Sequence, residues 1–575
     1  MAKLSRYIRP YVGYICLTLL IKTLGAFAEL TIPYLMEYIL SRGAETGQID
    51  LVFFYGGLML LCAVACLVLN ITANRMSAIS AGKITLALRH DLFEKLNSLS
   101  ARQMDELLVS SAESRLTSDT YNINQLLARA QRLGVRAPIL LVGGVAMMLM
   151  MDAGLALILI ALLPIIVLIV YYVTKTTIPL YTQQQSVLDR MVRTLQENIT
   201  GIRVVKALSK TEYEKARFNG INDELSAIDR RAGSISAATN PAASLVLNIG
   251  LTLVVLIGGF RVNSGLSESA TLVAFLQYFI MILNAMLGVT RIFIMWSKGE
   301  ASALRVAEVF ELPEDLAVLP QETSHTPGAH IEFCNVRFSY TGRGDNLTNI
   351  SFRLERGQTL GILGATGSGK STIVNLLMRI YDPDEGEIRI NGRDIRTIDR
   401  QELKGMFGVV FQNDFVTGGT VADNIRFFRD IPDEALDAAA DHAQAAAFIR
   451  EKEGGMAAEV TFRGNNLSGG QKQRLLIARA LAGKPEILVL DDASSALDYR
   501  TDAQLRAALG KNHGNVTTVL IAQRVSSLRH ADLILVLSDG RIIGSGDHGY
   551  LMETCEEYRI IAQTQMGARG EEAAV

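Results

Sequence analysis

Six long apolar stretches limit most strongly what this 575-residue chain can fold into. A helix needs about 20 mostly apolar residues to cross the hydrocarbon core of a bilayer. The stretches that meet this need lie at roughly 11–40, 51–78, 134–151, 153–174, 242–262 and 270–294. The first half of the chain is therefore expected to be a membrane domain with six helical spans.

The connections between these stretches alternate in length. Those at 41–50, around Asp152 and at 263–269 are short, whereas those at about 80–133 and 175–240 are long and rich in Lys and Arg. Cytoplasmic loops carry an excess of these basic residues, so the long connections are predicted to be cytoplasmic. In "LALRHDLFEKLNSL" the apolar residues recur every three or four positions, which predicts helices that extend the spans.

The second half of the chain has a different character. Hydrophobic residues make up 49% of the sequence, yet charged residues still reach 20%, which indicates a soluble part joined to the membrane part. Residues 313–329 contain three prolines and no hydrophobic period, as in a linker. The net charge of −2 gives no indication of nucleic-acid binding. The expected order is a transmembrane domain (1–312), a linker (313–329), an α/β domain of alternating strands and helices (330–567) and a disordered tail (568–575).

A phosphate-binding loop is predicted near the start of the α/β domain. The strand "QTLGIL" leads into "GATGSGKST" (364–372) and then into the helix "IVNLLMRI". Backbone N–H groups in such a loop, together with the helix N-terminus, attract phosphate oxygens. Lys370 would reach the outer phosphates, and the Ser371 hydroxyl would bind Mg²⁺. The predicted nucleotide-binding residues of the loop are Gly364, Thr366, Gly367, Ser368, Gly369, Lys370, Ser371 and Thr372.

Two further motifs point to the same site. The stretch "ILVLDD" is predicted to be a buried strand that places Asp491 at its carboxyl end, where open α/β sheets bind ligands, so Asp491 would hold Mg²⁺ through water. Between the two strands, "LSGGQKQRLLIARALAG" (467–483) predicts a helix whose Ser-Gly-Gly start could bind a second anion.

Together, these motifs resemble the ATP-binding cassette (ABC) transporter superfamily, and in particular the exporter half-transporters. The resemblance covers nearly the whole chain and includes Phe411-Gln412, "LSGGQ" (467–471), the strand 487–491 and "SALD" (495–498). It implies an all-α six-helix transmembrane domain followed by an α/β P-loop NTPase domain. It also implies ATP-driven export of a small molecule, lipid or peptide, with the nucleotide-binding domain in the cytoplasm. The absence of targeting signals and the compact size favour the plasma (inner) membrane of a bacterium.

The resemblance assigns roles to individual residues. Tyr340 would stack on adenine, Gln412 would contact Mg²⁺ and water, and Asp498 would contact the opposing subunit. The signature residues Ser468, Gly469, Gly470 and Gln471 would bind the γ-phosphate of a nucleotide held on the other subunit. This chain has one phosphate loop and one signature, so a second half-transporter subunit is required.

Two positions depart from the family pattern. Asp492 stands where the family usually has the catalytic Glu, and Gln523 stands where it usually has His. A general base must lie about 2.6–3.2 Å from the water it activates, and the shorter Asp holds its carboxylate farther back. Gln523 can donate a hydrogen bond but cannot carry the charge of an imidazolium. The site is therefore predicted to bind ATP and to hydrolyse it slowly.

The signature, by contrast, follows the family pattern. An intact signature together with altered hydrolytic residues resembles the degenerate-site subunit of a heterodimeric bacterial multidrug-type exporter. The predicted partner therefore carries the usual Glu and His. Two alternatives remain open: a homodimeric exporter that uses Asp492 as its base, and a regulator or channel built on the same fold. Residues 118–121 and 208–218 are expected to transmit closure of the nucleotide sandwich to the spans. The stretch "AEVTFRG" (458–464) also departs from the family pattern.

Three charges lie in or near the first span. Lys22, Glu29 and Glu37 are spaced by seven and eight residues, so they share one face of a helix. Charges inside a membrane usually face a cavity or one another. Either Glu29 contacts a cationic substrate, or it pairs with Lys22 while Glu37 lies at the outer interface.

Overall fold

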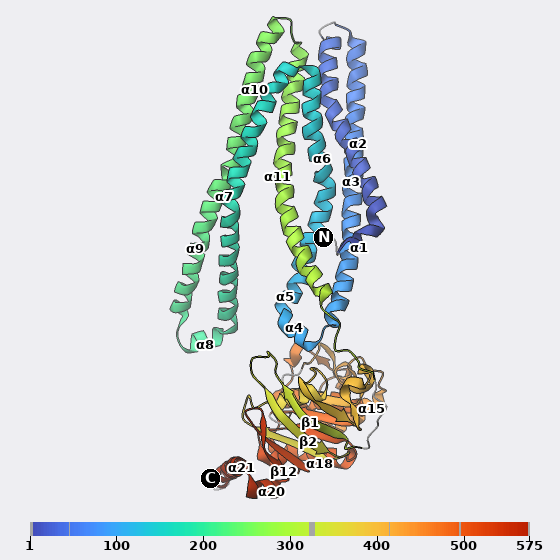
Figure 1. Ribbon diagram of the computed structural model, residues 1–575, viewed down its shortest axis with the longest axis vertical. Coiled ribbons are helices and arrows are strands. Elements are labelled where there is room, and N and C mark those ends of the chain that lie inside the picture. Colours follow the sequence, from blue (N-terminus) through green and yellow to red (C-terminus); the bar gives the residue numbers. More distant parts are fainter. Residues whose placement is uncertain (1–3, 45–46, 321–327, 413–414, 494–495, 573–575) are drawn as a thin grey trace. The chain divides into compact units, whose positions relative to one another are not determined.

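The computed structural model describes residues 4–572 apart from 45–46, 321–327, 413–414 and 494–495 (Figure 1). The chain divides into two compact units. The first comprises Met1–Asn97 and Val109–Leu312, and the second comprises Ser98–Leu108 and Pro313–Val575. The second part of the first unit ends at Leu312. The membership of Ser98–Leu108 in the second unit was not foreseen.

The described part of the first unit is helical. Its helices are α1 (Ser5–Ile8), α2 (Val12–Tyr38), α3 (Ile49–Asn97), α5 (Val109–Ser114), α6 (Thr120–Met151), α7 (Ala153–Thr200), α8 (Ile202–Ala207), α9 (Thr211–Ala237), α10 (Thr239–Asn263) and α11 (Ser269–Glu311). Short 3-10 or π-helical turns occupy Arg9–Tyr11, Ile39–Ala44 and Arg115–Asp119.

Six helical segments among the described residues are long and apolar enough to cross a membrane. They are Ser5–Gly43, Ile49–Asn97, Val109–Met151, Ala153–Thr200, Ser244–Asn263 and Ser269–Met286. Each overlaps one predicted span, which confirms the six-span expectation. The helices α3 and α7 continue well beyond the predicted spans, and α7 lies beside α9 with α8 between their ends (Figure 1). The long connections are therefore helical, as their periodicity indicated.

Asp152 separates two of these spans. Its extended backbone ends α6, and its Oδ1 accepts hydrogen bonds from the Gly154 and Leu155 N–H groups at 2.8 and 3.1 Å, which caps α7. Arg261 and Ser267 donate to its Oδ2 at 3.0 and 2.8 Å. This buried carboxylate thus organises the turn between the two helices.

Three sheets form among the described residues of the second unit. A six-stranded sheet has the order β12-β11-β3-β10-β9-β6, in which neighbouring strands are parallel except for the pair β11–β12. A four-stranded sheet has the order β2-β1-β4-β5 with antiparallel pairs, and β7 pairs with β8. The strands are β1 (Ile331–Phe338), β2 (Leu347–Leu354), β3 (Thr359–Gly364), β4 (Glu385–Ile390), β5 (Arg393–Asp394), β6 (Phe407–Val410), β7 (Gly419–Thr420), β8 (Glu459–Val460), β9 (Ile487–Asp491), β10 (Thr517–Ile521), β11 (Leu533–Ser538) and β12 (Arg541–Gly546).

Helices accompany these sheets, as the α/β prediction required. They are α4 (Ala101–Leu107), α12 (Lys370–Leu377), α13 (Arg400–Gly405), α14 (Val421–Arg426), α15 (Asp433–His442), α16 (Ala446–Glu451), α17 (Gly469–Ala482), α18 (Tyr499–Asn512), α19 (Val525–Leu528), α20 (His548–Thr554) and α21 (Glu556–Glu572). The last helix occupies most of the segment expected to be a disordered tail, so that expectation is wrong for 568–572. Residues 573–575, Ser495 of the "SALD" motif and 321–327 of the linker lie outside the described residues.

The helix α4 packs within the second unit. The Ser100 hydroxyl caps it by accepting from the Gln103 N–H at 3.3 Å, and the Gln103 side chain accepts from the Ser100 N–H at 2.8 Å. Arg102 donates to the Ser339 carbonyl at 2.9 Å, and Tyr381 donates to Asp105 Oδ2 at 2.6 Å. The segments expected to transmit closure, 118–121 and 208–218, lie in the first unit.

Candidate nucleotide-binding site

The glycines of the loop between β3 and α12 are required by its geometry. Gly367 and Gly369 have φ of +85° and +98°, a left-handed conformation that other residues rarely adopt. At Gly364, a Cβ would lie 2.4 Å from the Leu537 carbonyl oxygen on the neighbouring strand β11. The loop can therefore follow this path only with glycine at these positions.

A cavity of about 290 Å³ opens beside this loop. Its lining comprises Tyr340, Asn346, Thr366, Gly367, Gly369, Lys370, Ser371, Thr372, Gln412, Asp491, Asp492, Ile521 and Gln523. The Lys370 ammonium donates to the Gly364 and Ala365 carbonyls at 2.9 and 2.8 Å. Burial lowers the pKa of Lys370, and the nearby Asp491 and Asp492 oppose that shift. The Ser368 Oγ is buried and has no hydrogen-bond partner among the described residues. An ammonium and an unsatisfied buried hydroxyl beside a glycine loop fit a phosphate chain.

Asp491 ends the strand β9 at the floor of the cavity. Parallel pairing places it level with Ile521 of β10, so the carboxyl ends of both strands meet there. Asp491 is only 4% exposed and forms a hydrogen bond with the Ser371 side chain. Burial raises the pKa of its carboxyl group, and the hydrogen bond from Ser371 opposes that shift. A buried carboxylate beside a hydroxyl is a donor set that Mg²⁺ prefers.

The two residues that depart from the family pattern touch each other. Gln523 Nε2 donates to Asp492 Oδ2 at 3.2 Å, and both residues line the cavity. Asp492 has φ of +51°, and its N–H donates to the Ile521 carbonyl at 3.0 Å, which fixes the turn that follows β9. Burial raises the pKa of Asp492, although the positive charges of Lys370 and Arg524 oppose the shift.

Tyr340 lies at the edge of the same cavity. Its hydroxyl donates to Thr372 Oγ1 at 3.3 Å and accepts from Asn375 Nδ2 at 3.2 Å. Its ring meets Phe338 and Tyr381 edge to face, with centroids 4.8 and 5.1 Å apart. These contacts orient an aromatic ring at the cavity.

The signature residues take a different position. Ser468 caps the helix α17 by accepting from the Gln471 N–H at 3.3 Å, and Gln471 Oε1 accepts from the Ser468 N–H at 3.1 Å. Asp498 caps α18 and accepts from the Thr501 N–H at 2.7 Å, and this hydrogen bond lowers its pKa. Among the described residues, the lining of the phosphate-loop cavity includes neither the signature residues nor Asp498.

Most of the predicted site residues meet in one cavity. Gly364 and Ser368 belong to the same loop but do not line the cavity, and Ser468, Gly469, Gly470, Gln471 and Asp498 lie elsewhere in the unit. Asn346 and Ile521 line the cavity and were not predicted. Asn346 Oδ1 accepts from the Tyr340 N–H at 3.0 Å, a contact that no residue spacing marks.

Comparison with known proteins decides the family. Residues 15–286 match the family model described as the ABC transporter transmembrane region, and residues 347–495 match the one described as ABC transporter. An uncharacterized ABC transporter ATP-binding protein of Mycobacterium tuberculosis is 32% identical over 98% of each chain. The chain belongs to the ABC transporter family.

Other relatives of this ABC transporter agree. The uncharacterized ABC transporter ATP-binding protein YfiB of Bacillus subtilis is 31% identical over the full length of both chains. A fatty acid ABC transporter ATP-binding/permease protein of Mycobacterium bovis is 32% identical over 83% of this chain and 76% of its own length. The structure of a bacterial Atm1-family ABC exporter with ATP bound has the same fold, with a TM-score of 0.81, 24% identity and coverage of 96% of this chain and 99% of that one.

Membership fixes the general activity. This ABC transporter is a half-transporter with one transmembrane region and one ATP-binding domain, a multi-pass membrane protein whose ATP-binding domain is cytoplasmic. It couples ATP hydrolysis to transport and works as a dimer with a second half-transporter subunit.

The membrane charges of this ABC transporter have other partners than those expected. Lys22 does not pair with Glu29; it donates to Asn70 Oδ1 at 2.6 Å and to Asn74 Oδ1 at 3.2 Å. Glu29 accepts two hydrogen bonds from Arg136 of α6, at 2.6 and 3.0 Å. Sequence spacing along α2 could not identify these partners, because they come from other helices. Glu29 already has a cationic partner, so the expected contact with a cationic substrate is not supported.

The third charge of α2 also has a partner. Glu37 Oε1 accepts from the Thr271 hydroxyl of α11 at 2.7 Å. The contact joins the first and last spans within the first unit.

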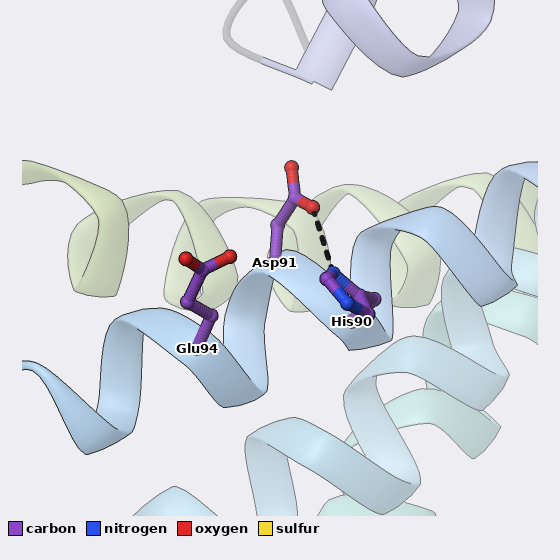
Figure 2. A group of neighbouring side chains, drawn as sticks. All are labelled: His90, Asp91 and Glu94. Atoms are coloured by element: carbon purple, nitrogen blue, oxygen red, sulfur yellow. Dashed lines mark hydrogen bonds and ion pairs between the residues drawn. The ribbon is translucent and has the colours of Figure 1, made fainter.

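A cluster on α3 carries no assigned role in this ABC transporter. His90, Asp91 and Glu94 lie close enough together to hold a metal ion (Figure 2). The Asp91 carboxylate accepts a hydrogen bond from the Tyr7 hydroxyl at 2.8 Å and lies 3.5 Å from the Arg6 guanidinium. These contacts give Asp91 a structural function in holding the amino-terminal segment against α3.

Proposed function

We propose that this chain is the weakly hydrolytic half of a heterodimeric exporter. Its own site binds ATP with Mg²⁺ and turns it over slowly. Its signature, 467–471, completes the nucleotide site of a partner that carries the usual Glu and His. The proposal rests on the chemistry of one cavity and on the separate position of the signature.

The cavity residues divide between the two parts of the ligand. Lys370 and the glycine loop, with Ser368 behind the cavity wall, would hold the phosphates, and Tyr340 would stack on adenine. Ser371, Gln412 and Asp491 would hold Mg²⁺, which supplies charge neutralisation for the phosphate oxygens. The fit is supported by the unsatisfied Ser368 hydroxyl, the buried Asp491 and the cavity volume of about 290 Å³.

The contact between Gln523 and Asp492 carries the proposal of slow hydrolysis. The amide that replaces the family's imidazole donates to the carboxylate that replaces the family's glutamate, at 3.2 Å. A neutral amide supplies no positive charge to a γ-phosphate. The short carboxylate, at a turn with φ of +51°, has one methylene fewer with which to reach an attacking water.

The position of the signature supports the need for a partner. Ser468 and Gln471 form a closed capping box at the start of α17, and they do not line the cavity that holds Lys370 and Asp491. The N–H groups at the start of a 14-residue helix are suited to an anion. A nucleotide on a second subunit would supply that anion.

Purification of the tagged chain from its source membrane, followed by native mass spectrometry, tests the proposal. We expect a stoichiometric second chain with Glu and His at the matching positions. A complex of this chain alone that hydrolyses ATP would contradict the heterodimer. It would favour the homodimer alternative, for which the position of Asp492 in the cavity is the supporting observation. An intact complex with no substrate-stimulated turnover would favour a regulator or channel.

A further inference from the structure

A second cavity lies among the helices of the first unit. Its volume is about 870 Å³, within the range of about 300–1,000 Å³ that is usual for small-molecule sites. Residues of α2, α3, α6 and α11 line it: Lys22, Glu29, Ile32, Ala63, Cys66, Asn70, Asn74, Arg129, Arg132, Leu133, Arg136 and Met295. The cavity therefore lies between helices that carry four of the six spans.

The charges that line this cavity are unbalanced. Its cations are Lys22, Arg129, Arg132 and Arg136, and Glu29 is its only carboxylate among the described lining residues. The pair between Arg136 and Glu29 neutralises one cation and leaves a net charge of +3. Arginine stays protonated at any physiological pH, so most of this charge does not depend on proton uptake.

The remaining cations lack carboxylate partners among the described residues. Lys22 is 4% exposed, and among the described residues it donates to the neutral side-chain amides of Asn70 and Asn74. Arg132 Nε is buried and has no hydrogen-bond acceptor in the part of the chain that the structure describes. Arg129 is exposed, whereas the buried Lys22 lies within the first span, where a charge is costly and usually marks a substrate pathway. An anion in the cavity would satisfy these donors.

The rest of the lining determines the kind of anion. Ile32, Ala63, Leu133 and Met295 give the cavity an apolar part beside its cations. Guanidinium groups bind carboxylates and phosphates through paired hydrogen bonds. We propose that this cavity binds an amphipathic anion, with its carboxylate or phosphate headgroup on Arg129, Arg132 and Lys22 and its apolar tail on the hydrophobic lining. The inference rests on the proposed export function and names the substrate class for it.

Equilibrium binding in the absence of ATP tests this inference separately from hydrolysis. The purified complex is placed in phosphatidylcholine nanodiscs, and binding of radiolabelled dodecyl phosphate is measured, with empty nanodiscs subtracted. We expect saturable binding that unlabelled dodecanoate displaces and dodecyltrimethylammonium does not. Displacement by phosphatidylglycerol, with little effect of dodecanoate, would still support an anion site. It would identify an anionic membrane lipid as the ligand.

Charge-removal variants locate the site. Arg129→Gln/Arg132→Gln should weaken dodecyl phosphate binding at least tenfold, since two of the proposed headgroup contacts are lost. The matched control is Arg230→Gln/Arg231→Gln, which removes two exposed arginines of α9 outside the cavity and should leave binding unchanged. Equal loss in both double variants, or stronger binding of the cation, would overturn the inference. Absence of anion binding in a complex that hydrolyses ATP would overturn this inference and leave the proposed function standing. Anion binding in a complex without hydrolysis would contradict only the proposed function.

Discussion

The Tyr381 hydroxyl donates a 2.6 Å hydrogen bond to Asp105 Oδ2 and so ties the nucleotide-binding fold to a short helix from the first third of the chain. Arg102 of the same helix donates to the Ser339 carbonyl, one residue before Tyr340 of the nucleotide cavity. The helix α4 is therefore in direct contact with the surroundings of the proposed adenine-binding residue.

Tyr381→Phe should loosen α4 without affecting nucleotide binding. The variant removes the donor to Asp105 and keeps the ring that packs against Tyr340 and Phe338. Faster hydrogen exchange in 98–108 with an unchanged affinity for ATP is expected. Tyr550→Phe, an exposed tyrosine of α20, is the control. Unchanged exchange in 98–108 would show that other contacts suffice to hold the helix.

Asp492→Glu/Gln523→His should increase hydrolysis at this chain's own site. The longer carboxylate and the imidazole restore the reach and charge that the native pair lacks, and a well-placed base contributes roughly 10²–10⁴-fold to rate. ATPase activity is measured in the complex after the catalytic Glu of the second subunit has been changed to Gln, so that this site dominates. An increase of about tenfold or more is expected. The control Asp437→Glu alters an exposed aspartate of α15 and should have no effect. No gain in the double variant would contradict the degenerate-site proposal.

Binding of Mg·ATP should weaken on acidification. The midpoint pH of this loss should be higher than the midpoint expected for an aspartate with an ordinary pKa. Burial raises the pKa of Asp491, and only the ionised carboxylate can hold a cation. Affinity is thus retained above the raised pKa and falls as the pH drops through it, whereas an exposed aspartate titrates near about 4. Titration of a fluorescent ATP analogue across pH, with and without Mg²⁺, measures the effect. Asp491→Asn should abolish the increase in affinity for the ATP analogue that Mg²⁺ produces. A midpoint near the ordinary aspartate value would contradict the prediction.

The same pKa shift affects the free protein in the opposite direction. A raised pKa means that the folded state binds a proton more tightly than the unfolded state does. Asp491 and Asp492 therefore stabilise the folded state at low pH. This contribution to the free energy of unfolding is lost as the pH rises through their raised pKa values. Thermal unfolding in nanodiscs without nucleotide should therefore show a smaller loss of stability with rising pH in Asp491→Asn than in the native chain.

Arg136→Met should destabilise the first unit more than the removal of both partners does. The single change leaves Glu29 without its partner, and because the pair is partly solvated we expect a loss of about 1–3 kcal/mol, below the value for a fully buried pair. The double variant Glu29→Leu/Arg136→Met removes the unpaired charge and should recover most of that loss. Thermal unfolding in nanodiscs measures both. An equal or larger loss in the double variant would mean that the pair contributes through more than charge compensation.

Sequence patterns predicted the parts of this structure that depend on residues close to one another along the chain. Apolar length identified the spans, and the glycine spacing of 364–372 identified the loop because only glycine tolerates its conformation at Gly367 and Gly369. The Glu29–Arg136 pair was not predicted, because its members are 107 residues apart and several cations could have reached Glu29. The contacts of α4 are likewise long-range, and nothing in "ARQMDEL" distinguishes it from any other short polar helix.

The inclusion of Ser98–Leu108 in the second unit bears on how the chain responds to cutting. The backbone passes from one unit to the other at three places, after residues 97, 108 and 312. One protease cut within 313–329 would leave two polypeptides of which the larger still contributes α4 to the nucleotide-binding unit. The hydrogen bonds of Arg102 and Asp105 to that unit would oppose dissociation. A nicked protein should thus migrate as one species in native gels and as two in denaturing gels.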